Sequence, residues 1–150
     1  MRVARSILIL TAGIFILAAT SVLTLCLAQE VLVAEVDIKP ETLNPKSKGK
    51  FTTCFVSAPE GYSAGDIIGE SVIITDIGGT TVNIEPVRWK VTDSEDDGVT
   101  ELMLKYSRAE VQASIVQDGL TGQVVFTIEG LLFDNTPFIG SDTVRVKKPK

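Results

Sequence analysis

The chain has 150 residues, with 14 Lys and Arg, 19 Asp and Glu and a net charge of −5 at pH 7, and it contains no His. An acidic surface repels the phosphate backbone, so this charge excludes nucleic acid as a partner. The absence of His excludes the common forms of the Ser and Cys triads and the imidazole zinc sites, and the length predicts one folded core after an N-terminal leader.

Residues 1–28 have the layout of an export leader. Two Arg residues within the first six positions precede an uncharged apolar stretch over residues 7–27. This order is typical of a secretory signal peptide, and the small side chains before Gln29 predict cleavage there, which leaves residues 29–150 as one domain. An uncut membrane anchor through residues 7–27 and lipidation at Cys26 are the alternatives, since about 20 apolar residues span a bilayer. In each case we expect a location at the cell surface or in the extracellular space.

The part of the chain after the leader is more acidic than the whole. It holds all 19 acidic residues but only 12 of the 14 basic ones, which gives a net charge of −7. Such a surface suits divalent cations or solubility. Cys54 is the one cysteine after the leader, so no intrachain disulfide can form once the leader is removed, and its place in an alternating apolar run predicts a small buried side chain.

The first half of the domain shows the period-two alternation of β-strands. Val31–Ile38 is the first predicted strand, and Asn44–Gly49 is a turn-rich loop. Lys50–Ser57, rich in aromatic and β-branched residues, is the second strand. Gly and Pro residues between positions 59 and 65 then break the pattern.

A β-hairpin is predicted next. Ser71–Asp76 and Thr81–Ile84 are its strands, joined by a turn at Gly78 and Gly79. The strand Val87–Val91 follows and places Trp89 on the same face as its two terminal residues. Because an indole has a large apolar area to bury, we expect Trp89 to be a core residue.

One helix is predicted, over Ser107–Val116. Ser107 stands three residues before Glu110, the spacing of a capping box, and the apolar side chains repeat at helical spacing. The other strands are expected at Glu101–Tyr106, Gln123–Glu129, Leu131–Phe133 and Thr143–Lys147, with a tight turn at Asp134-Asn135-Thr136. About eight or nine short strands with turns every 8 to 12 residues predict an all-β fold, an Ig-like antiparallel β-sandwich with one short helix.

The segment TDSEDDGVTEL, residues 92–102, concentrates acidic side chains between two strands. Oxygen-ligated Ca²⁺ loops carry carboxylates at the first, third and fifth positions and Gly at the sixth. The predicted ligands are therefore the side chains of Asp93, Glu95, Asp97 and Glu101 and the backbone oxygen of Val99, with Gly98 allowing the turn.

This loop differs from the helix-loop-helix form of a Ca²⁺ site. Its twelfth position, where that form has a bidentate Glu, is Leu104. We therefore expect a shorter loop between β-strands with a dissociation constant on the order of 10⁻⁴ to 10⁻³ M, which Ca²⁺ would fill outside a cell. The alternative is a solvated acidic turn whose charges keep a sheet edge from aggregating.

Four segments together resemble one family. They are VDIKPETLNPKSKGKF, PEGYSAGDI, VRWKVTDSEDDGVTELMLKY and DNTPFIGSDTVRVK, in this order along the chain. They are similar to a module of secreted and cell-surface proteins of archaea and some bacteria, which has VDIKPG near its start, an Asp-rich DxDGDG segment and a DGTPFEGSDTIRV ending. The resemblance implies that Asp93, Glu95 and Asp97 are the metal-loop positions, and that the module accompanies larger surface proteins.

These features predict an exported, non-catalytic β-sandwich that is stabilised by Ca²⁺ and has a structural, adhesive or interaction role with other surface proteins or polysaccharide. A carbohydrate-binding module is an alternative, with Trp89, Tyr62 and Tyr106 as the aromatic residues available for stacking. Self-assembly by donation of Val31–Ile38 to a neighbouring sheet is another. A glycoside hydrolase needs two opposed carboxylates, which one acidic loop does not provide.

Overall fold

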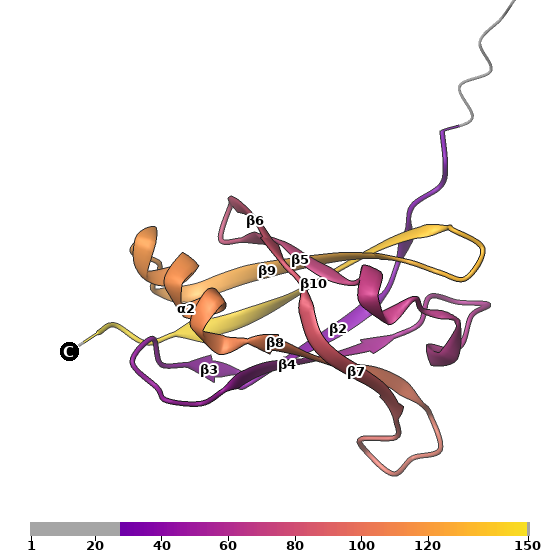
Figure 1. Ribbon diagram of the computed structural model, residues 1–150, viewed down its shortest axis with the longest axis horizontal. Helices are drawn as coiled ribbons and strands as arrows, with labels where there is room; N and C mark the ends of the chain where they lie inside the picture. Colours follow the sequence, from indigo (N-terminus) through magenta and orange to yellow (C-terminus); the bar gives the residue numbers. More distant parts are fainter. Residues whose placement is uncertain (1–27, 150) are drawn as a thin grey trace, which may run out of the picture.

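Two β-sheets packed face to face make up the computed structural model, which describes residues 28–149 (Figure 1). Most strand pairs are antiparallel, and one α-helix lies at the end of the sandwich nearest the C-terminus. The predicted all-β sandwich with one short helix is therefore confirmed. The predicted N-terminal signal or anchor helix lies outside the described residues.

The larger sheet has the strand order β1-β10-β9-β5-β6, and β3 also pairs with β10. Its strands are β1 (Leu32–Val33), β3 (Thr42–Leu43), β5 (Ile73–Ile77), β6 (Thr80–Ile84), β9 (Gly122–Leu131) and β10 (Pro137–Val146). Both β1 and β3 run parallel to β10, whereas the other pairs are antiparallel. The β5–β6 hairpin turns at Gly78 and Gly79, as predicted, and both glycines have positive φ angles.

The smaller sheet has the order β2-β4-β8-β7 and is entirely antiparallel. Its strands are β2 (Glu35–Lys39), β4 (Phe51–Ser57), β7 (Pro86–Thr92) and β8 (Glu101–Ser107). Alternate side chains of β4 and β8 are buried, because one face of this sheet lies on the core. The prediction that Cys54 is buried is confirmed, and burial raises the pKa of its thiol.

The helix α2 (Arg108–Gln117) buries Val111 and Ile115 against the core. Ser107 is its N-cap residue, but the Ser107 side chain makes no capping hydrogen bond, so the predicted capping box is wrong. The helix instead begins directly after β8, where the Arg108 N–H donates to the Lys50 carbonyl at 3.0 Å. Two short 3-10 helices, η1 (Ala64–Asp66) and η2 (Gly69–Ser71), connect β4 to β5.

The predicted first strand, Val31–Ile38, is divided at Ala34 into two strands that belong to different sheets. The Ala34 N–H donates to the Ile139 carbonyl of β10 at 2.9 Å, and the Ile38 N–H of β2 donates to the Asp142 carboxylate of β10 at 2.7 Å. A Cβ at Gly140 would lie 2.7 Å from the Ala34 carbonyl oxygen, so only glycine permits this approach. Residues 32–39 thus pass from the larger sheet to the smaller one and close one side of the sandwich.

The other side of the sandwich is formed by β6 and β7. Trp89 of β7 is 42% exposed, and Val91 on the same face is 48% exposed, whereas Val87 lies in a β-bulge between Pro86 and Arg88. The prediction that Trp89 is a core residue is therefore wrong, because the larger sheet does not cover this face of β7. The indole packs against Gly69 of η2, where any Cβ would clash with it.

Tyr106 connects the two layers through a buried hydrogen bond. Its side chain is fully buried, and its hydroxyl donates to the Val72 carbonyl at 3.0 Å. Burial raises the pKa of the phenol, so the group stays protonated and remains a donor. The hydroxyl of Tyr62 also donates a hydrogen bond, to the Asp134 carboxylate at 2.8 Å, but this bond is exposed to solvent.

We predict that Tyr106→Phe lowers the free energy of unfolding by about 1–2 kcal/mol, because it leaves the buried Val72 carbonyl without a donor. Urea unfolding measures this loss. The control Tyr62→Phe should cost clearly less, since water can replace the lost donor at Asp134. Equal losses in the two variants would contradict the importance of the buried bond.

Candidate metal site

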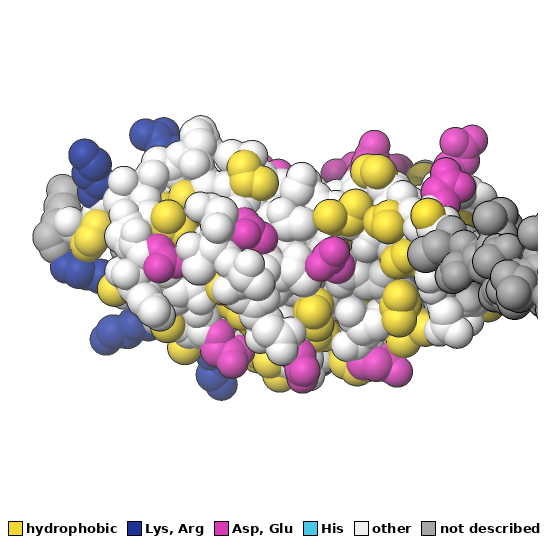
Figure 2. Space-filling model, turned by 90° about the horizontal axis from the view of Figure 1, so that it is seen from above, with side chains coloured by type: hydrophobic (Ala, Val, Ile, Leu, Met, Phe, Trp, Pro, Cys, Tyr) yellow, Lys and Arg dark blue, Asp and Glu magenta, His cyan; other side chains and the backbone are white. Residues whose placement is uncertain are grey.

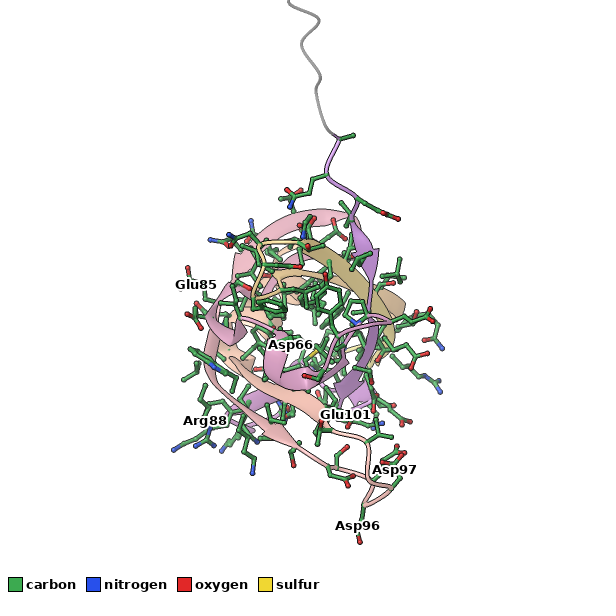
Figure 3. All side chains as sticks on the ribbon, turned by 90° about the vertical axis from the view of Figure 1, so that its right-hand side faces the viewer. Asp66, Glu85, Arg88, Asp96, Asp97 and Glu101 are labelled. Carbon is green, nitrogen blue, oxygen red and sulfur yellow. The ribbon has the colours of Figure 1, made fainter. Side chains whose placement is uncertain are left out.

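The acidic segment forms the turn between β7 and β8. Ser94–Thr100 are exposed to solvent, whereas Asp93 and Glu101 are half-buried. Figure 3 shows Asp96 and Asp97 at the tip of this hairpin and Glu101 nearer to the sandwich. The predicted ligands are thus all on one protruding turn.

Hydrogen bonds within the turn determine its shape. The Asp93 carboxylate accepts the backbone N–H groups of Asp97 at 3.2 Å and Gly98 at 2.9 Å, and the Asp97 carboxylate accepts the Val99 N–H at 2.8 Å. Positive φ angles of 55° at Asp96 and 84° at Gly98 reverse the chain. Aspartate favours such turns because its short side chain reaches nearby backbone donors. Asp93 therefore organises the turn.

The other four predicted ligands lie around one hollow. Glu95, Asp97, Val99 and Glu101 line a cavity of about 270 Å³, together with Glu35 of β2 and Ser57 of β4. Glu101 also accepts a hydrogen bond from the Ser94 hydroxyl. Glu35 was not among the predicted ligands, because it lies far away in the sequence. Only the pairing of Glu35 with Ser57 across β2 and β4 brings it to this place.

The oxygen donors of this hollow are of the kind that Ca²⁺ prefers, since they are carboxylates and carbonyls without nitrogen or sulfur. Within residues 28–149, however, no three Asp, Glu or Cys side chains lie close enough together to hold a metal ion. The exposed side chains of Glu95 and Asp97 would have to turn toward Glu101 to form a site. Ca²⁺ binding at these residues therefore stays a prediction.

A larger acidic groove adjoins this hollow. It has a volume of about 480 Å³, and Glu35, Asp37, Glu95 and Glu101 are its acidic lining residues. One cation stands beside it, since the Lys39 ammonium lies 2.7 Å from the Glu41 carboxylate and 3.1 Å from that of Asp37. The hydrogen bond to Glu41, followed by that to Asp37, raises the pKa of Lys39.

Basic side chains gather elsewhere. Figure 2 shows Lys and Arg residues at one end of the upper face, while Asp and Glu residues are spread over the rest of it. Arg145, Lys147 and Lys148 of the C-terminal segment line a separate hollow of about 620 Å³. The acidic hollow and this basic end are thus distinct surfaces.

Comparison of the chain with protein-family models, curated proteins and solved structures found no match. The resemblance to secreted and cell-surface modules therefore stays a prediction. In the part of the chain from residue 28 to residue 149, no helix has the length and apolar character needed to cross a bilayer. The predicted anchor through residues 7–27 lies outside that part.

We predict that Asp93→Asn lowers the free energy of unfolding by about 1 kcal/mol, because an amide offers one acceptor oxygen where the carboxylate uses two. The matched control is Asp96→Asn, which removes the same charge from the same turn and tolerates the positive φ angle, and its effect should stay within about 0.5 kcal/mol. Urea unfolding compares the two variants. If both proteins become more stable, repulsion between the carboxylates outweighs the hydrogen bonds of Asp93.

Proposed function

We propose that the protein is an exported, non-catalytic β-sandwich with a structural, adhesive or interaction role at the cell surface or in the extracellular space, and that Ca²⁺ binds at the β7–β8 turn. The leader-like residues 1–28 and the resemblance to secreted modules support the location. The sandwich fold and the absence of His from the sequence support a role other than catalysis.

The cavity shared by the turn and the two strands is the observation that carries the calcium proposal. Glu95, Asp97 and Glu101 reach it from the hairpin, and Glu35 reaches it from β2. Carboxylates that line one hollow repel one another, since salt screens charges effectively only beyond about 8 Å at physiological ionic strength. A divalent cation would remove this repulsion and would connect the protruding hairpin to the sandwich.

The calcium proposal predicts a large change in thermal stability. A ligand that binds only the folded state adds about 2.7 kcal/mol at 100 times its dissociation constant, which corresponds to a Tm increase of about 10 °C for a domain of this size. Calorimetry of the full chain in a mild detergent, with excess EDTA or with Ca²⁺ at tens of millimolar, measures this increase.

A pair of double variants provides the control. Glu95→Gln with Asp97→Asn should abolish the increase caused by Ca²⁺. Asp118→Asn with Glu129→Gln removes the same charge from exposed positions outside the turn and should retain it. A Tm that is equal in EDTA and Ca²⁺ would refute the calcium site and leave an exported sandwich without a metal.

Carbohydrate binding is the second candidate function, and the exposure of Trp89 favours it. An exposed indole can stack on the apolar face of a sugar ring, and it stands here between Arg88 and Lys90. Tyr106 is fully buried and cannot contribute, whereas Tyr62 is half-buried.

Self-assembly by strand donation is the other alternative. Residues of the predicted donor Val31–Ile38 already pair with β10 and β4 of their own domain, so donation would require these pairs to break.

If the protein binds polysaccharide, Trp89→Ala should lower its retention on the bound polymer about fivefold, because one stacked aromatic ring contributes about 1 kcal/mol. Co-sedimentation with insoluble polysaccharides measures retention. Phe133→Ala, at an exposed aromatic residue of another segment, is the control and should bind normally. Equal losses in both variants, or no retention of the unmodified chain, would exclude this function.

A further inference from the structure

The strand β7 is an edge strand with an open side. It pairs with β8 on one side, and no backbone hydrogen bond among residues 28–149 joins it to any strand on the other. Alternate N–H and C=O groups of an edge strand point outward, where they form a template for an additional strand. Backbone recognition of an extended segment is therefore possible along β7.

The two faces of β7 differ in chemistry. Trp89 and Val91 are exposed apolar residues on the face that continues the core, since they pair with the buried Leu104 and Leu102 of β8. Arg88 and Lys90 are exposed on the opposite face, and Figure 3 shows Arg88 pointing away from the sandwich. Since successive side chains of a strand point to opposite faces, β7 alternates between cationic and apolar residues from Arg88 to Val91, after a β-bulge at Val87.

The cations of this face have no acidic partner in the described part of the chain. Ion pairs in that part of the sandwich join Lys39 to Asp37 and Glu41, and none there involves Arg88, Lys90 or Lys105. The Arg88 guanidinium lies 4.8 Å from the centre of the Phe51 ring, and the Lys105 ammonium lies 5.6 Å from it. A hollow of about 430 Å³ is lined by Arg88, Trp89, Lys90, Met103 and Lys105. Positive charge therefore accumulates on the outer face of β7 and β8, next to the edge of the sheet, on a protein whose net charge is negative.

The same pattern opposes pairing of β7 with a second copy of itself. Full antiparallel overlap of two β7 strands would place Arg88 of each copy opposite Lys90 of the other, and like charges in directly opposite positions are destabilising. Pro86 at the start of the strand also lacks an N–H donor. A strand with carboxylates in these positions would instead form favourable cross-strand pairs with β7.

We propose that the open edge of β7 is a docking site for an extended segment of a partner protein in which acidic and apolar side chains alternate. The partner strand would extend the β2-β4-β8-β7 sheet by main-chain hydrogen bonds. Its carboxylates would face Arg88 and Lys90, and its apolar side chains would cover Trp89 and Val91. The site uses no residue of the acidic turn, so it is independent of calcium and goes beyond the function proposed above.

Trp89 allows a direct test, because it is the only tryptophan of the chain. The probe is a capped peptide as long as β7, 7 residues, that alternates glutamate and valine. Added to the full chain in a mild detergent, it should shift the Trp89 emission to shorter wavelength in a saturable manner. Replacing each glutamate by lysine, or methylating alternate backbone nitrogens, should abolish the shift, since these changes remove the charge pairing or the hydrogen-bond donors.

Charge reversal in the protein provides the second measurement. Arg88→Glu with Lys90→Glu should weaken binding of the glutamate peptide about tenfold, because opposite charges facing each other across the strands become like charges. Lys147→Glu with Lys148→Glu makes the same charge change at exposed C-terminal positions and should leave binding unchanged.

Three outcomes would overturn the proposal. The first is the absence of a saturable shift at millimolar peptide, and the second is equal binding of the lysine or N-methylated peptide. The third is an emission shift that an acidic polysaccharide such as polygalacturonate produces while the peptide has no effect. That result would assign this face to a sugar polymer. None of these outcomes bears on the calcium measurement, which depends on other residues.

Discussion

The hydrogen bond from Ala34 to Ile139 determines how the two sheets meet. On its N-terminal side the chain pairs with β10 in the larger sheet, and on its C-terminal side it pairs with β4 in the smaller one. The Asp142 carboxylate holds the second part, and Gly140 permits the close approach. Because one side of the sandwich is closed in this way, β6 and β7 are left on the other side with an open edge.

Much of the fold could be predicted from alternation alone. In β4 and β8 the predicted faces are correct, and Cys54 and Leu104 are buried because each points between the sheets. Trp89 shows the limit of this argument. Alternation tells which residues share a face, whereas burial also requires that the facing sheet extend over them. That extent depends on the long-range arrangement of strands, which a local pattern does not contain.

The candidate site, like the strands, was predicted from a local residue pattern, and part of that pattern is found in the structure. The spacing of acidic residues around Gly98 correctly placed a turn there, and it brought Glu95, Asp97 and Glu101 to one hollow. It assigned Asp93 to a metal, which stays a prediction, and it did not predict that this carboxylate accepts backbone N–H groups of its own turn. It also could not find Glu35, since that residue joins the hollow only through strand pairing. Local spacing therefore predicted the turn better than the complete set of side chains around it.

The β7–β8 hairpin combines two opposite electrostatic surfaces. Its tip is acidic and exposed, and the strand leading to it carries Arg88 and Lys90. Charges of opposite sign on one hairpin would suit two classes of partner, a cation at the tip and a carboxylate along the edge, as the two proposals require. Trp89 and Val91, exposed on the inner face of β7, add an apolar surface that charge alone would not provide.

The parallel pairing of β1 with β10 has a mechanical consequence. These strands are the first and the last of the described chain, and they lie side by side in the same direction. A force that pulls the two ends of the domain apart would slide them past each other along their length, so their hydrogen bonds would resist together. The pairing of β3 with β10 adds a second parallel contact near the other end of that strand. A domain tethered at one end and pulled at the other would thus resist shear at both ends of a single strand.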